Sequence, residues 1–163
     1  MRTESTLKHL SASECAGLLA AGRFGRLAVI VEGQPMIFPV NYLFRDGAIV
    51  FRTNRGTKLS ASDYARVAFE IDGVHPDGQR GWSVVVRGRA YEITESFGRS
   101  AEHVRALPIP SALRDSEEPV VEIIPESVTG REIGSSANPV VFTPLEPIWV
   151  AWPPRPMVER RRR

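Results

Sequence analysis

A two-residue turn, Asp46-Gly47, separates two apolar extended runs and constrains the fold more than any other feature of the sequence. The run before it spans Met36 to Phe44, and the run after it spans Ala48 to Thr53. Asp-Gly between two such runs is the strongest short-range signal for a β-hairpin, because both turn residues must adopt positive φ. A third extended run, Phe24 to Val31, precedes another turn signal at residues 32–35. The three runs predict an antiparallel meander.

Further extended segments are expected at Val67 to Ile71, Trp82 to Thr94 and Pro119 to Ile124, after which residues 125–131 leave the sheet. Gly88, in the middle of the longest segment, indicates a bulge or a close approach of another backbone. Six or seven short strands with hairpin spacing predict a mainly β (α+β) fold. We expect a six- to seven-stranded antiparallel split β-barrel with peripheral helices.

Three helical segments are expected around these strands. Residues 11–22 form the first, with Ser11 as N-cap, Glu14 completing a capping box and Gly22 ending the helix. The others are one or two turns over Lys58 to Ala65 and a helix over Glu95 to Leu107, which two prolines stop. We therefore expect one barrel domain over residues 1–133, followed by a Pro/Trp-rich arm and basic tail over residues 134–163.

Charge and composition argue against several function classes. No apolar run reaches the roughly 20 residues that a membrane helix needs, so a cytoplasmic protein is expected, with no membrane partner. The net charge of +2 arises from the last nine residues, which contain five arginines, so no nucleic-acid partner is expected. The three histidines, His9, His75 and His103, lack metal-ligand spacing, and no metal site is predicted. Catalytic side chains remain unassigned.

Two segments carry groups suited to a ligand. Between Val50 and Lys58 a strand ends, a turn containing Gly56 follows and a helix begins, which gathers Arg52, Thr53, Thr57 and Lys58 near helix N-terminal amides. Such groups bind phosphate, although a solvated turn would have the same sequence. In the segment Ile37 to Tyr42, Pro39 favours an edge strand whose backbone could face a flat heteroaromatic ring. Barrel packing is the alternative for this second segment.

Five motifs occur in a characteristic order: Gly25-Arg26-Leu27-Ala28, Pro39-Val40-Asn41-Tyr42, Phe51-Arg52-Thr53 with Gly56-Thr57-Lys58, Val67-Ala68-Phe69-Glu70-Ile71-Asp72, and Gly81-Trp82-Ser83-Val84-Val85-Val86-Arg87-Gly88-Arg89-Ala90. In this order they resemble the pyridoxamine 5'-phosphate oxidase-like family of FMN-binding split barrels. The similarity is closest to its nitroimidazole-resistance-like branch. It covers roughly residues 8–132.

The resemblance implies a homodimer with FMN at the subunit interface and an oxidoreductase activity on a small-molecule substrate. By this resemblance, the FMN ring is lined by Pro39, Val40, Asn41 and Tyr42, and the ring edge or ribityl chain contacts Arg52 and Thr53. The phosphate is bound by Thr57 and Lys58. Trp82 and Ser83 approach the flavin from the adjacent strand or from the other subunit. Vitamin B6 oxidases also share a C-terminal arginine and histidine, whereas no histidine follows His103 here. The resemblance therefore does not extend to vitamin B6 oxidation.

Three alternatives remain on the same fold. The chain could be a non-catalytic flavin carrier or sensor, or a haem-binding protein, because a fold does not determine a function. It could also be a reductase that uses a deazaflavin coenzyme. The acidic tail of that coenzyme requires a basic groove, which Arg55, Arg80, Arg87 and Arg89 could supply.

Overall fold

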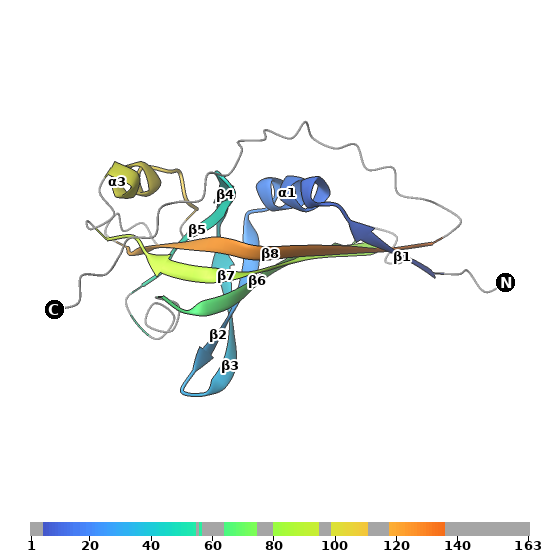
Figure 1. Ribbon diagram of the computed structural model, residues 1–163, viewed down its shortest axis with the longest axis horizontal. Helices are drawn as coiled ribbons and strands as arrows, with labels where there is room; N and C mark the ends of the chain where they lie inside the picture. Colours follow the sequence, from blue (N-terminus) through green and yellow to red (C-terminus); the bar gives the residue numbers. More distant parts are fainter. Residues whose placement is uncertain are drawn as a thin grey trace.

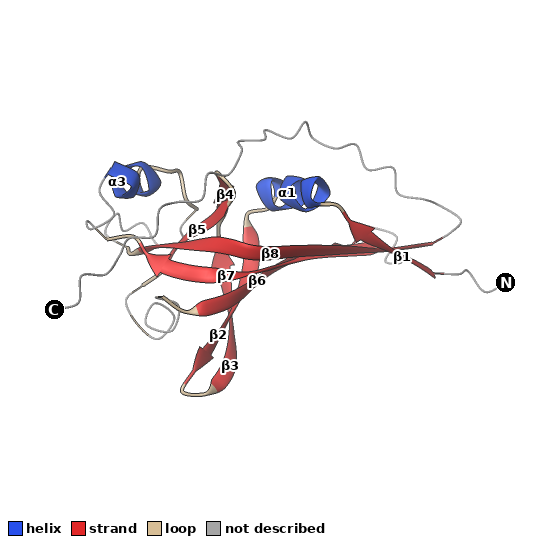
Figure 2. Ribbon diagram, in the orientation of Figure 1, coloured by secondary structure: helices blue, strands red, loops and turns tan. Residues whose placement is uncertain are grey.

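Strands make up most of the described chain (Figure 2). The computed structural model describes residues 5–54, 56, 64–74, 80–94, 99–110 and 118–135. Two helices, α1 and α3, accompany eight strands. Their bounds are β1 Ser5–Leu10, α1 Ala12–Ala21, β2 Phe24–Val31, β3 Gln34–Asn41, β4 Leu43–Arg45, β5 Ala48–Arg52, β6 Arg66–Val74, β7 Gly81–Glu92, α3 Arg99–Arg105 and β8 Val120–Ser135.

All the strand pairs are antiparallel and belong to one sheet, in the order β3-β2-β6-β7-β8-β5-β4, with β1 also paired to β8. The strands at the two ends of this order, β3 and β4, are consecutive in the chain and meet at Tyr42. The sheet therefore curls on itself (Figure 1). This curled antiparallel half-barrel confirms the predicted split-barrel fold class.

Alternation along each strand separates an inner face from an outer face. On β2, for example, Leu27 and Val29 are buried, while Arg26 and Ala28, which alternate with them, are partly exposed. The inner side chains form the main core, which α1 covers with Leu18 and Leu19. A second cluster lies under α3 and contains Val50, Ile93, Val104, Ile109 and Val120. The two helices accordingly lie on opposite sides of β4 and β5 (Figure 1).

The local signals in the sequence are confirmed. Asp46 and Gly47 have φ values of 50° and 76°, as a tight hairpin turn requires. Ser11 and Glu14 form both hydrogen bonds of the capping box. At Gly88 the β7–β8 register shifts, and a Cβ built there would lie 2.2 Å from the backbone oxygen of Ile124.

One prediction about the sheet is wrong. Residues 125–131 do not leave it, because β8 runs unbroken to Ser135 and also pairs with β1, a strand that was not expected. Pro125 is tolerated because it adjoins the register shift, where Glu126 is the extra residue of a bulge. Within the expected helices, residues 58–63 and 95–98 lie outside the described residues, as do residues 136–163 of the expected arm.

None of the helices in the described ranges is long and apolar enough to span a membrane.

The close approach at Gly88 leads to a stability prediction. Gly88→Ala is expected to lower the free energy of unfolding by about 2 kcal/mol, because the backbone of Ile124 cannot yield to the new methyl group. Gly17→Ala is the matched control: it lies inside α1 with open space at its Cβ, and is expected to raise that free energy by about 0.5–1 kcal/mol. Chemical denaturation measures both. A Gly88→Ala protein as stable as the parent would contradict the bulge packing.

Candidate functional site

The sequence motifs divide between the two faces of the sheet. Pairing places Pro39 beside Arg26, Glu70 and Val85 in one row across β3, β2, β6 and β7. By alternation, Asn41 and Ser83 share this outer face with Pro39. Val40, Tyr42 and Trp82 belong to the inner side and pack in or against the main core. The side chains of the predicted ring contacts therefore do not all converge on one face.

Tyr42 is part of the core. Its side chain is fully buried, its hydroxyl donates a 2.8 Å hydrogen bond to the carbonyl oxygen of Leu19, and its ring meets Phe69 edge-on at 4.9 Å. Burial raises the pKa of Tyr42 to about 12. Because this side chain joins the barrel to α1, only the backbone of Tyr42 can face a ligand on the outer side.

Trp82 and Ser83 are neighbours on β7, so their side chains point to opposite faces of the sheet. The indole of Trp82 lies against Gly73, where an added Cβ would come within 2.7 Å of the ring. Ser83 lies on the outer face of β7, opposite Asp72. Since β2 and β6 separate β7 from β3, Ser83 is about 14 Å from Asn41 across the sheet. These two polar side chains of one chain do not meet at a single point.

Strand β3 has the chemistry of a ring-binding edge. It ends the strand order, and β2 is its only partner strand among those the structure describes. Such an edge presents backbone N–H and C=O groups to a ligand, and Pro39 leaves a gap in the row of donors. Pro39 is exposed and Asn41 is half-buried beside it. This mixed set of donors and acceptors fits the polar edge of a heteroaromatic cofactor.

A charged cluster on the same face was not recognised from the sequence. One nitrogen of Arg26 bonds the carboxylate of Glu70 at 3.1 Å and also contacts the carboxylate of Asp72. Burial raises the pKa of Glu70, Asp72 adds to that rise, and Arg26 opposes it. The polar position of Arg26 within an alternating strand could have indicated this cluster, but its two partners come from another strand.

The structure gives Arg52 and Thr53 structural contacts. The guanidinium of Arg52 donates hydrogen bonds to the carbonyl oxygens of Arg105, at 3.0 Å, and Glu118, at 3.4 Å. Arg105 is the last residue of α3, so Arg52 ties the end of that helix to β5. Thr53 is buried, and its N–H donates to the carbonyl oxygen of Pro119 at 3.1 Å. The predicted phosphate residues Thr57 and Lys58 lie outside the described residues.

Comparisons with known proteins agree on one family. A family model described as pyridoxamine 5'-phosphate oxidase matches residues 11–132. An uncharacterized protein of Mycobacterium tuberculosis is 36% identical over 138 residues, which cover 80% of this chain and 88% of that protein.

Several solved structures are also similar. An FAD binding protein from Mycobacterium smegmatis has a TM-score of 0.64 and 31% identity, and the match covers 76% of this chain and 95% of that one. An FAD-binding protein from Mesorhizobium loti has a TM-score of 0.60 and 30% identity, with 77% and 97% covered. A putative 5-nitroimidazole antibiotic resistance protein from Bacteroides thetaiotaomicron shares the fold, with a TM-score of 0.59, 15% identity, and 83% and 95% covered.

The contacts of Arg52 lead to a second prediction. Arg52→Ala is expected to lower the free energy of unfolding by about 1–3 kcal/mol, because the bonds that hold the end of α3 are lost. Arg45→Ala, at an exposed position on β4, is the control and is expected to change it by less than about 0.5 kcal/mol. Denaturant titration compares the two. Equal stability of both variants would show that Arg52 does not anchor α3.

Proposed function

The chain belongs to the pyridoxamine 5'-phosphate oxidase family, and on this basis we propose that it is a cytoplasmic, flavin-dependent oxidoreductase of small molecules. The proposed cofactor contains FMN, either free or as the corresponding half of FAD. The isoalloxazine ring lies on the outer face at the open edge of β3, beside Pro39 and Asn41. The backbone of Val40 and Tyr42 completes this contact, and Thr57 and Lys58 hold the phosphate.

The observation that carries this proposal is the combination of a strand edge at β3 with the polar side chain of Asn41 on the outer face of that strand. Pro39 and Asn41 lie on that face, whereas α1 covers the inner face. Two similar solved proteins at 30% identity or more are named as FAD-binding, which favours a flavin at the corresponding place. A flavin ring needs donors and acceptors at one edge and a flat surface beneath it, and β3 offers both.

The residues of this chain bind and orient the cofactor. When bound, a flavin supplies the redox chemistry, so no side chain is required as acid or base. The backbone of β3 would align the ring edge, while the Thr57 hydroxyl and the Lys58 ammonium would hold the phosphate by charge-assisted bonds. Arg26, held between Glu70 and Asp72, keeps two carboxylates of this face paired beside the ring. Substrate would reach the ring from its free side.

A homodimer with the flavin between subunits is part of the proposal. The outer face exposes large apolar side chains, among them Phe24, Ile30 and Ile37, and exposed apolar surface of this kind marks interaction sites. Ser83 is also too far from Asn41 to share a ring with it in one chain. A second copy packed on this face would bring its own Ser83 to the ring, and would cover the apolar residues.

The flavin assignment predicts a coloured, reducible protein. The purified chain should show flavin absorbance that bleaches with NADH or NADPH and returns with an electron acceptor. Replacing both Thr57 and Lys58 with Ala should weaken flavin binding by about tenfold to a hundredfold, because charge-assisted bonds to phosphate are lost. Arg45→Ala removes a positive charge from the hairpin end of β4, at the opposite end of β5 from Arg52, and should leave the affinity unchanged.

Other outcomes of the same experiment separate the alternatives. Bound flavin that no nicotinamide donor reduces would favour a carrier. A colourless protein that binds reduced deazaflavin but not flavin would favour the deazaflavin reductase, and a Soret band would favour a haem-binding protein.

If the outer face is the dimer interface, a charge introduced there should weaken the association of the two subunits. Ile37→Lys should shift the protein from dimer to monomer at micromolar concentration, since it places an ammonium in the proposed interface. Met36→Lys, an exposed neighbour with the opposite orientation on β3, is the control and should leave the dimer intact. Light scattering reports the mass. A parent protein that is already monomeric would contradict the intersubunit site.

A further inference from the structure

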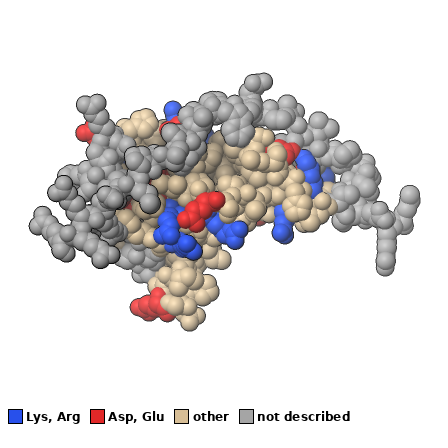
Figure 3. Space-filling view, in the orientation of Figure 1, with Lys and Arg blue, Asp and Glu red and all other residues tan. Residues whose placement is uncertain are grey.

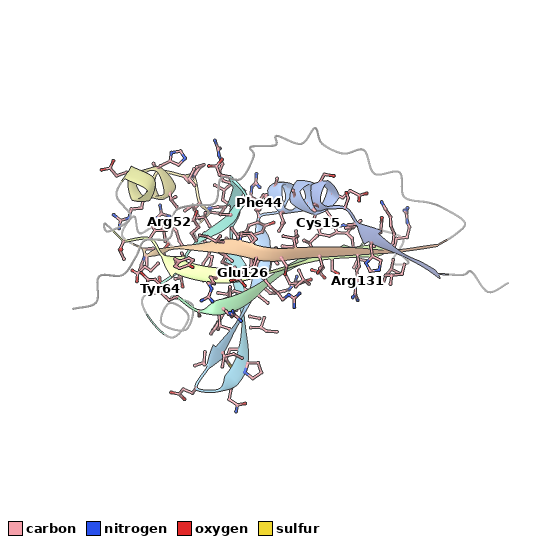
Figure 4. All side chains as sticks on the ribbon, in the orientation of Figure 1. Cys15, Phe44, Arg52, Tyr64, Glu126 and Arg131 are labelled. Atoms are coloured by element: carbon pink, nitrogen blue, oxygen red, sulfur yellow. The ribbon has the colours of Figure 1, made fainter. Side chains whose placement is uncertain are left out.

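An exposed arginine on β8 lies between two polar side chains in one row of the sheet. Arg131 is directly opposite His9 of β1 on one side and directly opposite Ser83 of β7 on the other. Side chains that face each other across adjacent strands share one face of the sheet, with Cβ atoms about 4.5–5.5 Å apart. We call His9, Arg131 and Ser83 the Arg131 row. Figure 4 shows Arg131 on the side of β8 that is turned away from Cys15, which is the outer face.

Arg131 is a positive charge without an acidic partner. Among the residues that the structure describes, its guanidinium has neither a hydrogen bond nor an ion pair. By contrast, Arg26 contacts two carboxylates, and Arg89 donates to the carboxylate of Glu126 at 3.1 Å. Figure 3 likewise shows some basic side chains beside acidic ones and others surrounded by uncharged surface. The planar fork of N–H donors on Arg131 is therefore available to an anion from outside the chain.

The two neighbours of Arg131 add donors of their own. The imidazole of His9 carries at least one N–H, and the hydroxyl of Ser83 can donate as well. His9 is exposed and Ser83 is half-buried, and they are two strand spacings apart, about 10 Å, with Arg131 between them. Beyond Ser83 the row continues to the carboxylate of Asp72, which contacts Arg26. One fixed positive charge close to a carboxylate favours a singly charged ligand over a phosphate dianion.

Apolar side chains form the adjacent outward-facing row. Strand pairing aligns Leu7, Ile133, Gly81 and Val74 across β1, β8, β7 and β6. More than half of each apolar side chain is exposed, at 57% for Leu7, 52% for Ile133 and 71% for Val74, and exposed apolar surface of this kind marks interaction sites. We call these three residues the apolar row. Arg131 and Ile133 are two residues apart on β8, about 7 Å, so one small molecule can contact both rows.

The Arg131 row also has a defined relation to the proposed flavin site. Ser83 is its member nearest to β3 in the strand order, and it is the residue that a second copy would bring to the ring beside Asn41. Arg131 and His9 lie one and two strands beyond Ser83. A molecule held by the partner's Arg131 would therefore lie next to the ring.

We propose that the Arg131 row and the apolar row bind a small carboxylic acid with an apolar ring or chain, and that such acids are the substrates of the flavin-dependent reaction. Arg131 holds the carboxylate through two parallel N–H bonds, while His9 and Ser83 donate to its remaining lone pairs. The apolar row contacts the rest of the molecule. The role as substrate rests on the proposed function, whereas the binding site itself consists of residues from one chain.

The test compares three probes by calorimetry on the purified full-length protein, at about 0.15 M salt, where distant charges are screened. The probes are phenylacetate, its uncharged amide phenylacetamide, and acetate. The parent protein should bind phenylacetate at least about tenfold more tightly than either of the others, because the amide lacks the charge and acetate lacks the apolar group. Arg131→Gln should lower the affinity for phenylacetate about tenfold and leave that for the amide unchanged. Arg131→Lys should keep part of the preference, since the charge remains but the planar fork is lost.

Two further variants separate the contributions of the rows. Ile133→Ser should weaken the binding of phenylacetate and of its amide by the same factor, because it removes an apolar contact only. Arg87→Gln is the charge-matched control: Arg87 lies on the outer face of β7 and donates to the Ser127 hydroxyl at 3.2 Å, and this variant should bind the probes as the parent does. Ile133, Arg87 and Arg131 are all exposed, so the variants should remain folded.

Several results would overturn the inference. Equal affinity of the parent protein for phenylacetate and its amide would refute the carboxylate site, and an Arg131→Gln protein that binds phenylacetate like the parent would show that the acid binds elsewhere. Phenylacetate, but not acetate, should also change the absorbance spectrum of the bound flavin; binding without such a change would refute the role as substrate.

Failure of this inference can be told apart from failure of the proposed function. A protein that binds flavin but not phenylacetate would refute this inference alone. A protein that binds phenylacetate through Arg131 but binds no flavin would refute the proposed function and the role of the acid as substrate, while the carboxylate site would stand.

Discussion

The burial of alternate side chains inside the curled sheet is the constraint on which the other features depend. On β7, Val84, Val86 and Ala90 are buried within the core, so Ser83, Val85 and Arg87 must face outward. A shift of one residue would expose the apolar set and bury the charged one. The same constraint turns Tyr42 inward and leaves Asn41 and Pro39 at the open edge. The location of the candidate site therefore follows from the core.

The features that depend on neighbours in sequence could be predicted. Ser11 and Glu14 each accept a hydrogen bond from the other's backbone N–H at the start of α1. Asp46 and Gly47 adopt the positive φ values of a tight turn, and neither feature depends on residues distant in the sequence. Gly88 also signalled its bulge, because a strand interior seldom has a glycine without a close neighbour. The order of these elements, together with the motifs, was sufficient to indicate the split barrel.

The features that depend on distant partners could not be predicted. β1 becomes a strand because β8 is available beside it, and β8 continues past Pro125 because a bulge removes the need for that N–H. In the candidate site, the motif around Pro39 was recognised as a unit, but its side chains alternate between faces. The contacts of Arg52 with α3 and of Arg26 with β6 join residues more than 40 positions apart, and no local pattern encodes them.

The most direct test of the account is a crystal structure of the flavin-bound protein, because the central claim concerns the face on which the cofactor lies. The account predicts the isoalloxazine ring on the outer side, against the edge of β3 at Pro39 and Asn41, with Tyr42 still bonded to Leu19. A flavin inside the barrel, in contact with the side chains of Tyr42 and Trp82 beneath α1, would contradict it.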